Sequence, residues 1–258
     1  MTSRSEDERL AAGIARQAGE LLVSLRQSGL SGRELGDRGD AESNSLIIGR
    51  LSAKRPGDTI LSEESPDDRR RLDADRVWIV DPLDGTREYR TPGRSDWAVH
   101  IALWVRGIGL SASAVALPTS GEVFTSATAQ LRSHERPREA GDPLLIAVSA
   151  SRPQPEAEAV AEATGFRLVR IGSAGAKVMA VLNGQVDAYI HCGGQWEWDS
   201  AAPVGVARGA GLHTSRVDGT ELVYNQAHPY LPDLLVCRRE VAGILLDALE
   251  AQRLGSSE

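Results

Sequence analysis

The chain is short of cysteine, of aromatic residues and of long apolar runs. Its 258 residues include two cysteines, Cys192 and Cys237, with neither a CxxC spacing nor a disulfide framework, which favours a reducing compartment. Aromatic residues make up 4 %, so we expect a core of Ala, Val and Leu. No apolar run approaches the ~20 residues of a membrane-spanning helix, and the polar residues 1–9 do not fit a signal peptide. We therefore expect a cytoplasmic protein with no membrane partner.

Basic charge is also in short supply. Lys and Arg number 29 against 36 Asp and Glu, which gives a formal net charge of −7. This balance argues against a nucleic acid polymer as partner, because such binding needs a basic face. A small anionic substrate stays open, since a bound metal ion can invert the local charge.

The first half of the sequence predicts two helices followed by strands. Helical periodicity covers residues 10–25, and a second helix is expected at 41–54, before the turn residues 55–58. Strands are expected at 59–62, 77–80, 97–105, 110–117 and 122–125. The polar stretch 128–143 is interpreted as a linker between an N-terminal α+β domain, 1–135, and a C-terminal α/β domain, 136–258.

The second half alternates between strands and helices, which is typical of an α/β layer. Strands are expected at 145–148, 168–171 and 186–190, and helices at 156–164, 174–182, 201–210 and 240–253. Residues 217–220 contain Asp-Gly and predict a hairpin turn. The expected fold class is therefore α/β, with an α+β N-terminal part.

The strongest chemical signal is an acidic turn after the apolar strand 77–80. The strand delivers Asp81 to its end, and Pro82 fixes the turn so that the Leu83 carbonyl and the Asp84 carboxylate can face one point. Three oxygens from four consecutive residues suit a hard divalent cation.

The next two residues are suited to phosphate. Gly85 allows close approach of the backbone, and Thr86 offers a hydroxyl and an N–H at an expected helix start. A polar turn that only caps the helix would explain Asp-Gly alone, but it explains the whole run poorly.

Two further acidic runs are weaker signals on their own. Glu63 and Glu64 follow a short strand, and taken alone a solvated acidic turn accounts for them better than a metal site does. Asp199 lies where a helix begins, so a plain N-cap is the alternative. The neighbouring Trp196 and Trp198 favour a packed and positioned carboxylate.

Taken together and in this order, the three runs resemble the signatures of the inositol monophosphatase family over nearly the whole chain. The stretch Gly85-Thr86-Arg87-Glu88-Tyr89 is similar to the bisphosphate nucleotidase branch, often called CysQ, and especially to its actinobacterial members. The run from Gln195 to Asp199, and Gly172-Ser173 with Lys177, point the same way. The resemblance implies a layered αβαβα sandwich with the site between its two halves.

The resemblance also implies a set of Mg²⁺ ligands. These are Glu63, Asp81, the Leu83 carbonyl, Asp84 and Asp199. Glu63 and Asp81 would hold a first ion, and Asp81, Asp84 and Asp199 a second, with a third ion left open. Lithium, which competes for a weaker magnesium position, is expected to inhibit.

Catalytic and substrate-binding roles follow from the same resemblance. Glu63, Thr86 and Asp40 form the implied catalytic group, in which Thr86 orients or deprotonates the attacking water and Asp40 supports that water or a third ion. Where many members read Thr-Ala-Ala-Asp, this chain has Asp37-Arg38-Gly39-Asp40, so Asp37 is an alternative to Asp40, or part of an exposed loop. The implied substrate contacts are Gly85, Thr86, Gly172, Ser173, Lys177 and Glu197.

The Gly172–Lys177 stretch is one residue longer than the pattern of the branch. Gly172 and Ser173 still look like a helix N-terminus directed at an anion. Which of Ser173 and Lys177 contacts substrate stays open, and a solvated helix residue is the alternative for Lys177.

The implied activity is hydrolysis by metal-bound water. Two cations ~3.5–4 Å apart can neutralise a phosphate dianion and activate water without a covalent intermediate. No histidine is required, and all five are interpreted as structural: His100, His134, His191, His213 and His228. The implied substrate is adenosine 3',5'-bisphosphate, converted to AMP and phosphate as in sulfur assimilation. Alternatives are a broad inositol monophosphatase or fructose-1,6-bisphosphatase and, from a different class, a non-catalytic phosphate-binding protein. The partner is a small phosphate monoester, and a homodimer is left open.

Overall fold

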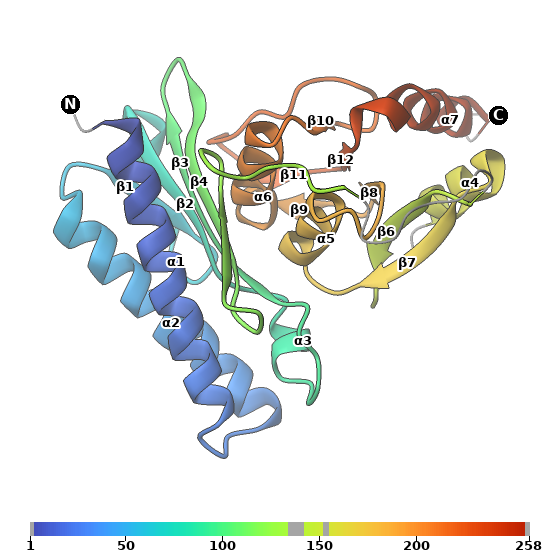
Figure 1. Cartoon of the computed structure of the whole chain (residues 1–258). Helices are drawn as coiled ribbons and strands as arrows, with labels where there is room; N and C mark the ends of the chain where they lie inside the picture. The colour runs from blue at the N-terminus through green and yellow to red at the C-terminus, as the bar shows by residue number, and fades with distance from the viewer. Residues whose placement is uncertain (1–2, 134–141, 152–154, 256–258) are drawn as a thin grey trace.

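The structure is a computed structural model that describes residues 3–133, 142–151 and 155–255 (Figure 1). His134 and much of the expected 128–143 linker, with its 135/136 boundary, lie outside the described residues. No helix in the described part of the chain is long and apolar enough to cross a membrane.

The first sheet has five strands in sequential order and is covered by two long helices. Its strands are β1 (Thr59–Ser62), β2 (Arg76–Asp84), β3 (Ala98–Val105), β4 (Gly109–Leu117) and β5 (Glu122–Thr125). Helices α1 (Arg4–Arg26) and α2 (Gly32–Lys54) pack on one face of this sheet. The buried residues Ala11, Ile14, Ala18 and Leu22 recur every three to four positions, so α1 presents one apolar face to the sheet.

The second sheet is mixed, in the order β10-β12-β8-β6-β7. Its strands are β6 (Leu145–Ser149), β7 (Arg167–Ile171), β8 (Ala188–His191), β10 (His213–Ser215) and β12 (Leu234–Cys237). Helices α4 (Pro155–Thr164) and α7 (Ala242–Gly255) cover its outer face. A separate two-stranded ladder joins β9 (Gln195–Trp196) to β11 (Tyr230–Leu231).

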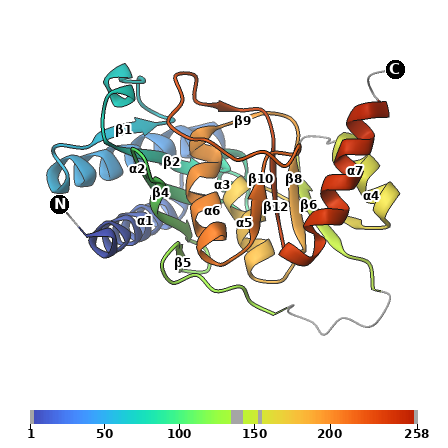
Figure 2. The same ribbon diagram turned by 90° about the horizontal axis from the view of Figure 1, so that it is seen from above.

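Two helices form the central layer between the sheets. These are α5 (Ala174–Leu182) and α6 (Glu197–Gly209), and α6 contacts β2, β3 and β4. Figure 2 shows the resulting helix, sheet, helix, sheet, helix layers in turn. Strand β3 alternates between two cores, because Ala98 and Ala102 face the central helices while Val99 and Ile101 face α1 and α2. The predicted αβαβα sandwich is therefore confirmed.

Three local predictions were wrong. Helix α2 begins at Gly32, so Asp37 and Asp40 lie in a helix and not in a loop. Helix α6 begins at Glu197, four residues before the expected start. The 217–220 turn forms, but it joins no hairpin, because β10 pairs with the distant β12.

The early start of α2 has a packing reason. Gly36 and Gly39 look like helix breakers in the sequence. A Cβ at Gly39 would lie 2.7 Å from Cε1 of Tyr89 and 3.0 Å from Cδ2 of Leu83, so this glycine brings α2 close to the end of β2.

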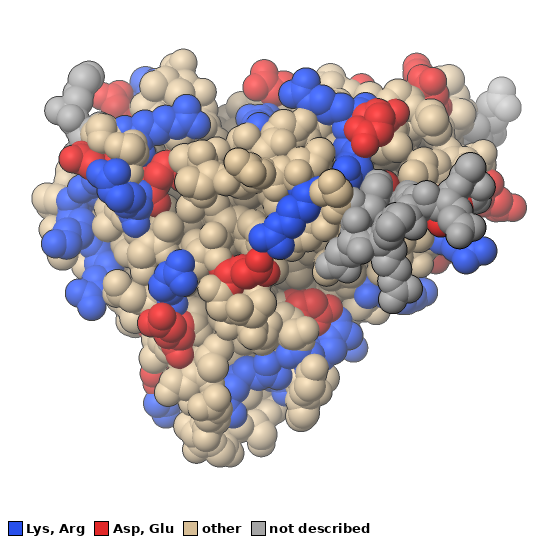
Figure 3. All heavy atoms as spheres, viewed as in Figure 1, with Lys and Arg blue, Asp and Glu red and all other residues tan. Residues whose placement is uncertain are grey.

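Charged side chains of both signs are distributed over the surface shown in Figure 3. Lys and Arg are interspersed with Asp and Glu there, and no broad basic area is visible on the face shown in Figure 3.

Candidate active site

The end of β2 forms the centre of the candidate site. Asp81 is buried, and its Oδ1 accepts the Leu83 N–H at 3.0 Å. The pairing of β2 with β3 shifts between Asp81 and Asp84, so the strand turns out of regular register there. Gly85 follows with φ +86°, a left-handed conformation that favours glycine. This turn places two carboxylates on the same side of the chain.

Asp84 is held by the N-terminus of α5 and by a buried histidine. Its carboxylate accepts the N–H groups of Ala174 at 3.2 Å and Gly175 at 2.6 Å. Nε2 of His100 lies 3.1 Å from Asp84 Oδ2. Burial would raise the pKa of Asp84, but the charge and hydrogen bond of His100 and the Gly175 N–H outweigh it and hold that pKa below its usual value.

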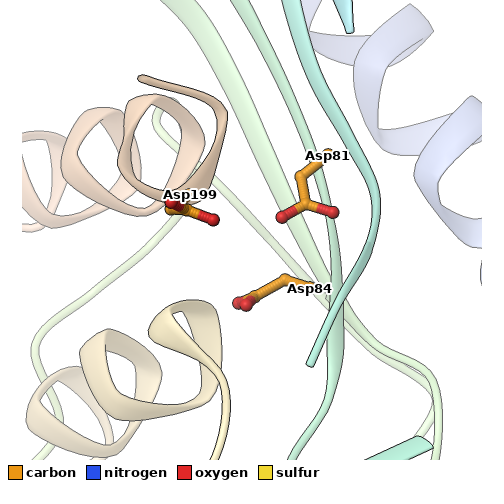
Figure 4. Close-up of side chains that lie close together, drawn as sticks. All are labelled: Asp81, Asp84 and Asp199. Carbon is orange, nitrogen blue, oxygen red and sulfur yellow. The ribbon is translucent and has the colours of Figure 1, made fainter. Parts of the chain in front are cut away.

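Asp199 comes from the other half of the chain and completes an acidic cluster. It is the third residue of α6, not its N-cap, and its Oδ2 accepts the Trp196 N–H at 2.6 Å. One carboxylate oxygen from each of Asp81, Asp84 and Asp199 lies within 4.8 Å of the others. The three carboxylates point toward a common centre in Figure 4.

Electrostatics make this cluster costly without a cation. Burial, and then the charge of Asp84, raise the pKa of Asp199 to about 6. Burial and the charge of Glu63 raise the pKa of Asp81 well above its usual value. A positive charge among these oxygens would relieve their repulsion.

Glu63 borders the cluster from the end of β1. Glu63 as a whole residue is exposed, but its carboxyl is close enough to Asp81 to hydrogen-bond. Burial of the carboxyl and the charge of Asp199 raise the pKa of Glu63 to about 8.

Asp40 and Thr86 form a pair beside the cluster. The Thr86 hydroxyl lies 3.2 Å from Asp40 Oδ1 and 3.3 Å from the Leu83 carbonyl, either of which can accept its proton. Burial, and then the charge of Glu64, raise the pKa of Asp40 to about 7. Asp37 is exposed on the same helix, so the geometry favours Asp40 as the residue near the site.

The Gly172–Lys177 segment lies against the Gly85 turn. A Cβ at Gly85 would lie 2.9 Å from Cβ of Ser173, and the Ser173 hydroxyl caps α5 by accepting the Ala176 N–H at 3.0 Å. The Gly172 N–H is donated to Asp96 at 2.6 Å. Some of the N–H groups at the start of α5 that were expected to bind a substrate anion are therefore bound to groups of the protein itself.

Lys177 is not a solvated helix residue. It is 3 % exposed, its Nζ donates to the Gly172 carbonyl, and the ammonium lies 4.9 Å from the centre of the Tyr189 ring. Burial lowers the pKa of Lys177 to about 8, although nearby acids, led by Asp84, oppose this shift.

Glu197, an expected substrate contact, is engaged by backbone N–H groups within the protein. Its side chain is fully buried, and its two oxygens accept the N–H groups of Asn225 at 2.6 Å and Gln226 at 2.7 Å. With both oxygens used internally, Glu197 orders the loop that follows residue 224.

His100 was missed by sequence reasoning. Besides Asp84, it meets the Trp198 carbonyl through Nδ1 at 3.2 Å, so it links β3 to the helix that carries Asp199. The available signal was a polar residue within an apolar strand that pairs with β2, where His100 is the direct partner of Asp81.

Comparison with known proteins identifies the family. A family model described as "Inositol monophosphatase family" matches residues 4–251. The chain belongs to the inositol monophosphatase family. Within the family it is 55 % identical over 238 residues to the "3'-phosphoadenosine 5'-phosphate phosphatase" of Mycobacterium tuberculosis, covering 90 % of this chain and 89 % of that protein. It is 35 % identical over 221 residues to "Inositol-1-monophosphatase SuhB" of the same species, covering 76 % and 75 %.

A solved structure gives the same fold. The crystal structure of CysQ from Bacteroides thetaiotaomicron, a bacterial member of the inositol monophosphatase family, matches with a TM-score of 0.76 at 25 % identity, covering 91 % of this chain and 97 % of that one.

The donor set of this inositol monophosphatase family member fits a hard divalent cation. Carboxylate and carbonyl oxygens are the ligands that Mg²⁺ prefers. The raised pKa values of Asp81 and Asp199 mean that the cluster gains from positive charge. Family membership and the buried aspartates together indicate metal binding.

Proposed function

We propose that this chain is a Mg²⁺-dependent phosphatase that hydrolyses the 3'-phosphate of adenosine 3',5'-bisphosphate, giving AMP and phosphate. The observation that carries the proposal is 55 % identity, over 90 % of the chain, to a mycobacterial 3'-phosphoadenosine 5'-phosphate phosphatase. The acidic cluster beside a phosphate-type turn supports it independently.

The proposed ligands divide between two ions. Glu63 and Asp81 would hold one ion, and Asp81, Asp84 and Asp199 would hold the other, with the Leu83 carbonyl as a further donor. The cluster that lies within 4.8 Å matches the second set. Bound Mg²⁺ supplies neutralisation of the phosphate dianion and a more acidic water. Residues 1–135 provide every ligand except Asp199, which comes from 136–258.

In this proposal, Thr86 and Asp40 accept the proton that the attacking water loses. The Thr86 hydroxyl lies within hydrogen-bond distance of Asp40, and its lone pairs can accept a hydrogen from water. A carboxyl whose pKa is near 7 can both take up and release a proton at neutral pH. Glu63, whose carboxyl interacts with Asp81, completes the catalytic group.

Substrate phosphate is assigned to the turn and the start of α5. Gly85 and Thr86 offer backbone N–H groups, and Ser173 lies against Gly85. Gly172 brings this segment close to Glu88, because a Cβ there would overlap the Glu88 side chain. Lys177, below the segment, adds positive charge to a site rich in acids.

A broad inositol monophosphatase or fructose-1,6-bisphosphatase is the second candidate, supported by 35 % identity to an inositol-1-monophosphatase. A non-catalytic phosphate-binding protein would be expected to have lost a ligand, and Glu63, Asp81, Asp84, Thr86 and Asp199 are all present. The proposal includes a cytoplasmic location. Whether the chain forms a homodimer is a question that light scattering, which gives the molar mass in solution, would answer.

The test is phosphate release by the purified protein with Mg²⁺. Initial rates are compared on adenosine 3',5'-bisphosphate, inositol 1-phosphate and fructose 1,6-bisphosphate. We expect the largest kcat/KM on the nucleotide, and inhibition by lithium at low millimolar concentration. A far larger kcat/KM on inositol 1-phosphate would replace the first candidate with the second, and Mg²⁺ binding without turnover of any monoester would indicate a binding protein.

A further inference from the structure

Two exposed aromatic side chains lie together on the short β9–β11 ladder, whose strand β9 immediately precedes α6. Trp196 is 40 % exposed and Tyr230 is 43 % exposed. In the described chain no other Trp, Tyr or Phe side chain is this exposed. The two residues are direct cross-strand partners in the two-residue β9–β11 ladder, although 33 positions of sequence separate them.

The rings form an ordered set, which we call the aromatic platform: Trp196, Trp198, His228 and Tyr230. Trp196 stacks on Trp198 with ring centres 5.4 Å apart and planes 15° apart. Tyr230 meets Trp196 edge-on at 5.7 Å, and His228 lies 5.6 Å from it at a tilt. Because Trp198 lies against one face of Trp196, a planar partner would stack on the opposite face, beside Tyr230 and His228.

Buried polar groups fix the loop that carries half of the platform. The fully buried guanidinium of Arg71 donates to Asn225 Oδ1 at 2.7 Å and to the Gln226 carbonyl at 2.9 Å. Glu197 accepts the backbone N–H groups of the same two residues, and its own N–H is donated to the Pro229 carbonyl at 2.9 Å. Such a network rigidifies a loop when every member is satisfied.

A glycine makes room for the tyrosine. Gly194 has φ +75°, and a Cβ there would overlap the Tyr230 hydroxyl. A glycine at position 194 is therefore needed for Tyr230 to lie where it does against Trp196.

One backbone hydrogen bond links the platform to the acidic cluster. The backbone N–H of Trp196 is donated to Asp199 Oδ2, so the residue that carries this ring also anchors a member of the cluster. An aromatic face beside a phosphate site offers stacking to a planar base, and every base has a π-face that aromatic rings accept.

We propose that the aromatic platform is the base-binding subsite of this enzyme, and that the exposed face of Trp196 stacks on the purine of the nucleotide substrate. The proposal rests on the proposed function and deepens it. It makes Trp196 a specificity-determining residue that separates nucleotides from phosphate esters that have no base.

The test compares Trp196→Ala with wild type on two substrates. For adenosine 3',5'-bisphosphate we expect KM to rise roughly 5- to 150-fold, the loss typical of one base–aromatic stack. For inositol 1-phosphate, which has no base, KM should change far less. Trp196→Phe should recover much of the nucleotide KM. Ile244→Ala, an exposed apolar residue on the distant α7, is the matched control.

A binding measurement makes the result independent of turnover. Titration of AMP and of ribose 5-phosphate by calorimetry gives the contribution of the base as the ratio of their Kd values. Trp196→Ala should bring that ratio close to one. Should Trp196→Ala fail to fold, Tyr230→Ala is measured in the same way.

Two results would overturn the subsite. One is an equal change of KM on both substrates, which would mean that the ring acts only through Asp199. The other is an unchanged AMP to ribose 5-phosphate ratio in the variant. If wild type hydrolyses inositol 1-phosphate but not the nucleotide, the proposed function is wrong, and the ratio of Kd values still decides the subsite by itself.

Discussion

Gly175→Ala is expected to damage the site, although the same change stabilises most helices. Gly175 lies in the first turn of α5, and its N–H is donated to Asp84 at 2.6 Å. A Cβ there would overlap the His100 ring at Nε2 and lie 3.0 Å from Cβ of Ala98. His100 is fully buried, and each of its ring nitrogens faces an oxygen, so the ring cannot move aside without losing a partner.

The expected magnitude is the sum of opposing effects. Glycine to alanine inside a helix normally stabilises by roughly 0.5–1 kcal/mol. Over-packing of a close-packed interior costs typically ~1–3 kcal/mol. We therefore expect a net loss of about 1–2 kcal/mol in the free energy of unfolding. Because α5 and His100 both hold Asp84, we also expect Mg²⁺ affinity to fall roughly 10- to 100-fold, as when a residue behind a metal ligand is changed.

The assay is urea unfolding in EDTA, followed by calorimetric titration of Mg²⁺ into each protein. The matched control is Gly13→Ala in α1, where an added Cβ meets nothing within 4 Å and stability should rise. The reasoning would be refuted if Gly175→Ala unfolded at the same or a higher urea concentration than wild type and bound Mg²⁺ equally well.

Three further predictions concern the acidic cluster. Asp199→Asn should lower kcat by about 100-fold or more with an unchanged circular dichroism spectrum, because a proposed ligand of the second ion is lost; wild-type turnover would remove Asp199 from the ligand set. Mg²⁺ at 100 times its Kd should stabilise the fold by about 2.7 kcal/mol, seen as a rise in Tm of several degrees that is smaller in Asp199→Asn at the same concentration; equal shifts would contradict binding at this site. In EDTA, stability should fall as pH rises from about 6 to 8. The folded-state pKa values of Glu63, about 8, and Asp199, about 6, lie above the values of these groups in the unfolded chain. Their contribution to the free energy of unfolding is therefore complete below the unfolded pKa and is lost as pH rises past the folded pKa. Thermal unfolding across this range measures it, and a flat profile for wild type would speak against the raised values.

The sequence alone was sufficient to predict the part of the candidate site that one strand and the turn after it provide. The apolar strand before Asp81, the proline after it and the glycine at position 85 all act within a few residues, so the strand and its acidic end could be predicted, although β2 continues to Asp84, four residues beyond the expected end. The alternation of strands and helices likewise predicted three strands of the second sheet, β6, β7 and β8, but not β10 and β12. These features depend on periodicity and turn chemistry, which any single sequence displays.

Long-range packing explains what could not be predicted. Gly39 looked like a loop residue because its packing against Tyr89 depends on a segment 50 positions away. Lys177 was placed in solvent or on substrate, since nothing near it in the sequence reveals the Tyr189 ring that covers it. His100 gains its role only when two strands of the first sheet meet α5 and α6.

The buried Arg71 couples distant parts of the chain in a way that constrains their evolution. Its guanidinium is bound by Asp67 and by the Asn225 loop, whose backbone also requires Glu197. Loss of Asp67 would leave the buried guanidinium without its counter-ion, and loss of Asn225 would leave one of its N–H groups without this acceptor; both changes are destabilising. We therefore expect these positions to vary as a block among relatives, and a lineage that abandons one of them to rebuild the whole loop together with its substrate preference.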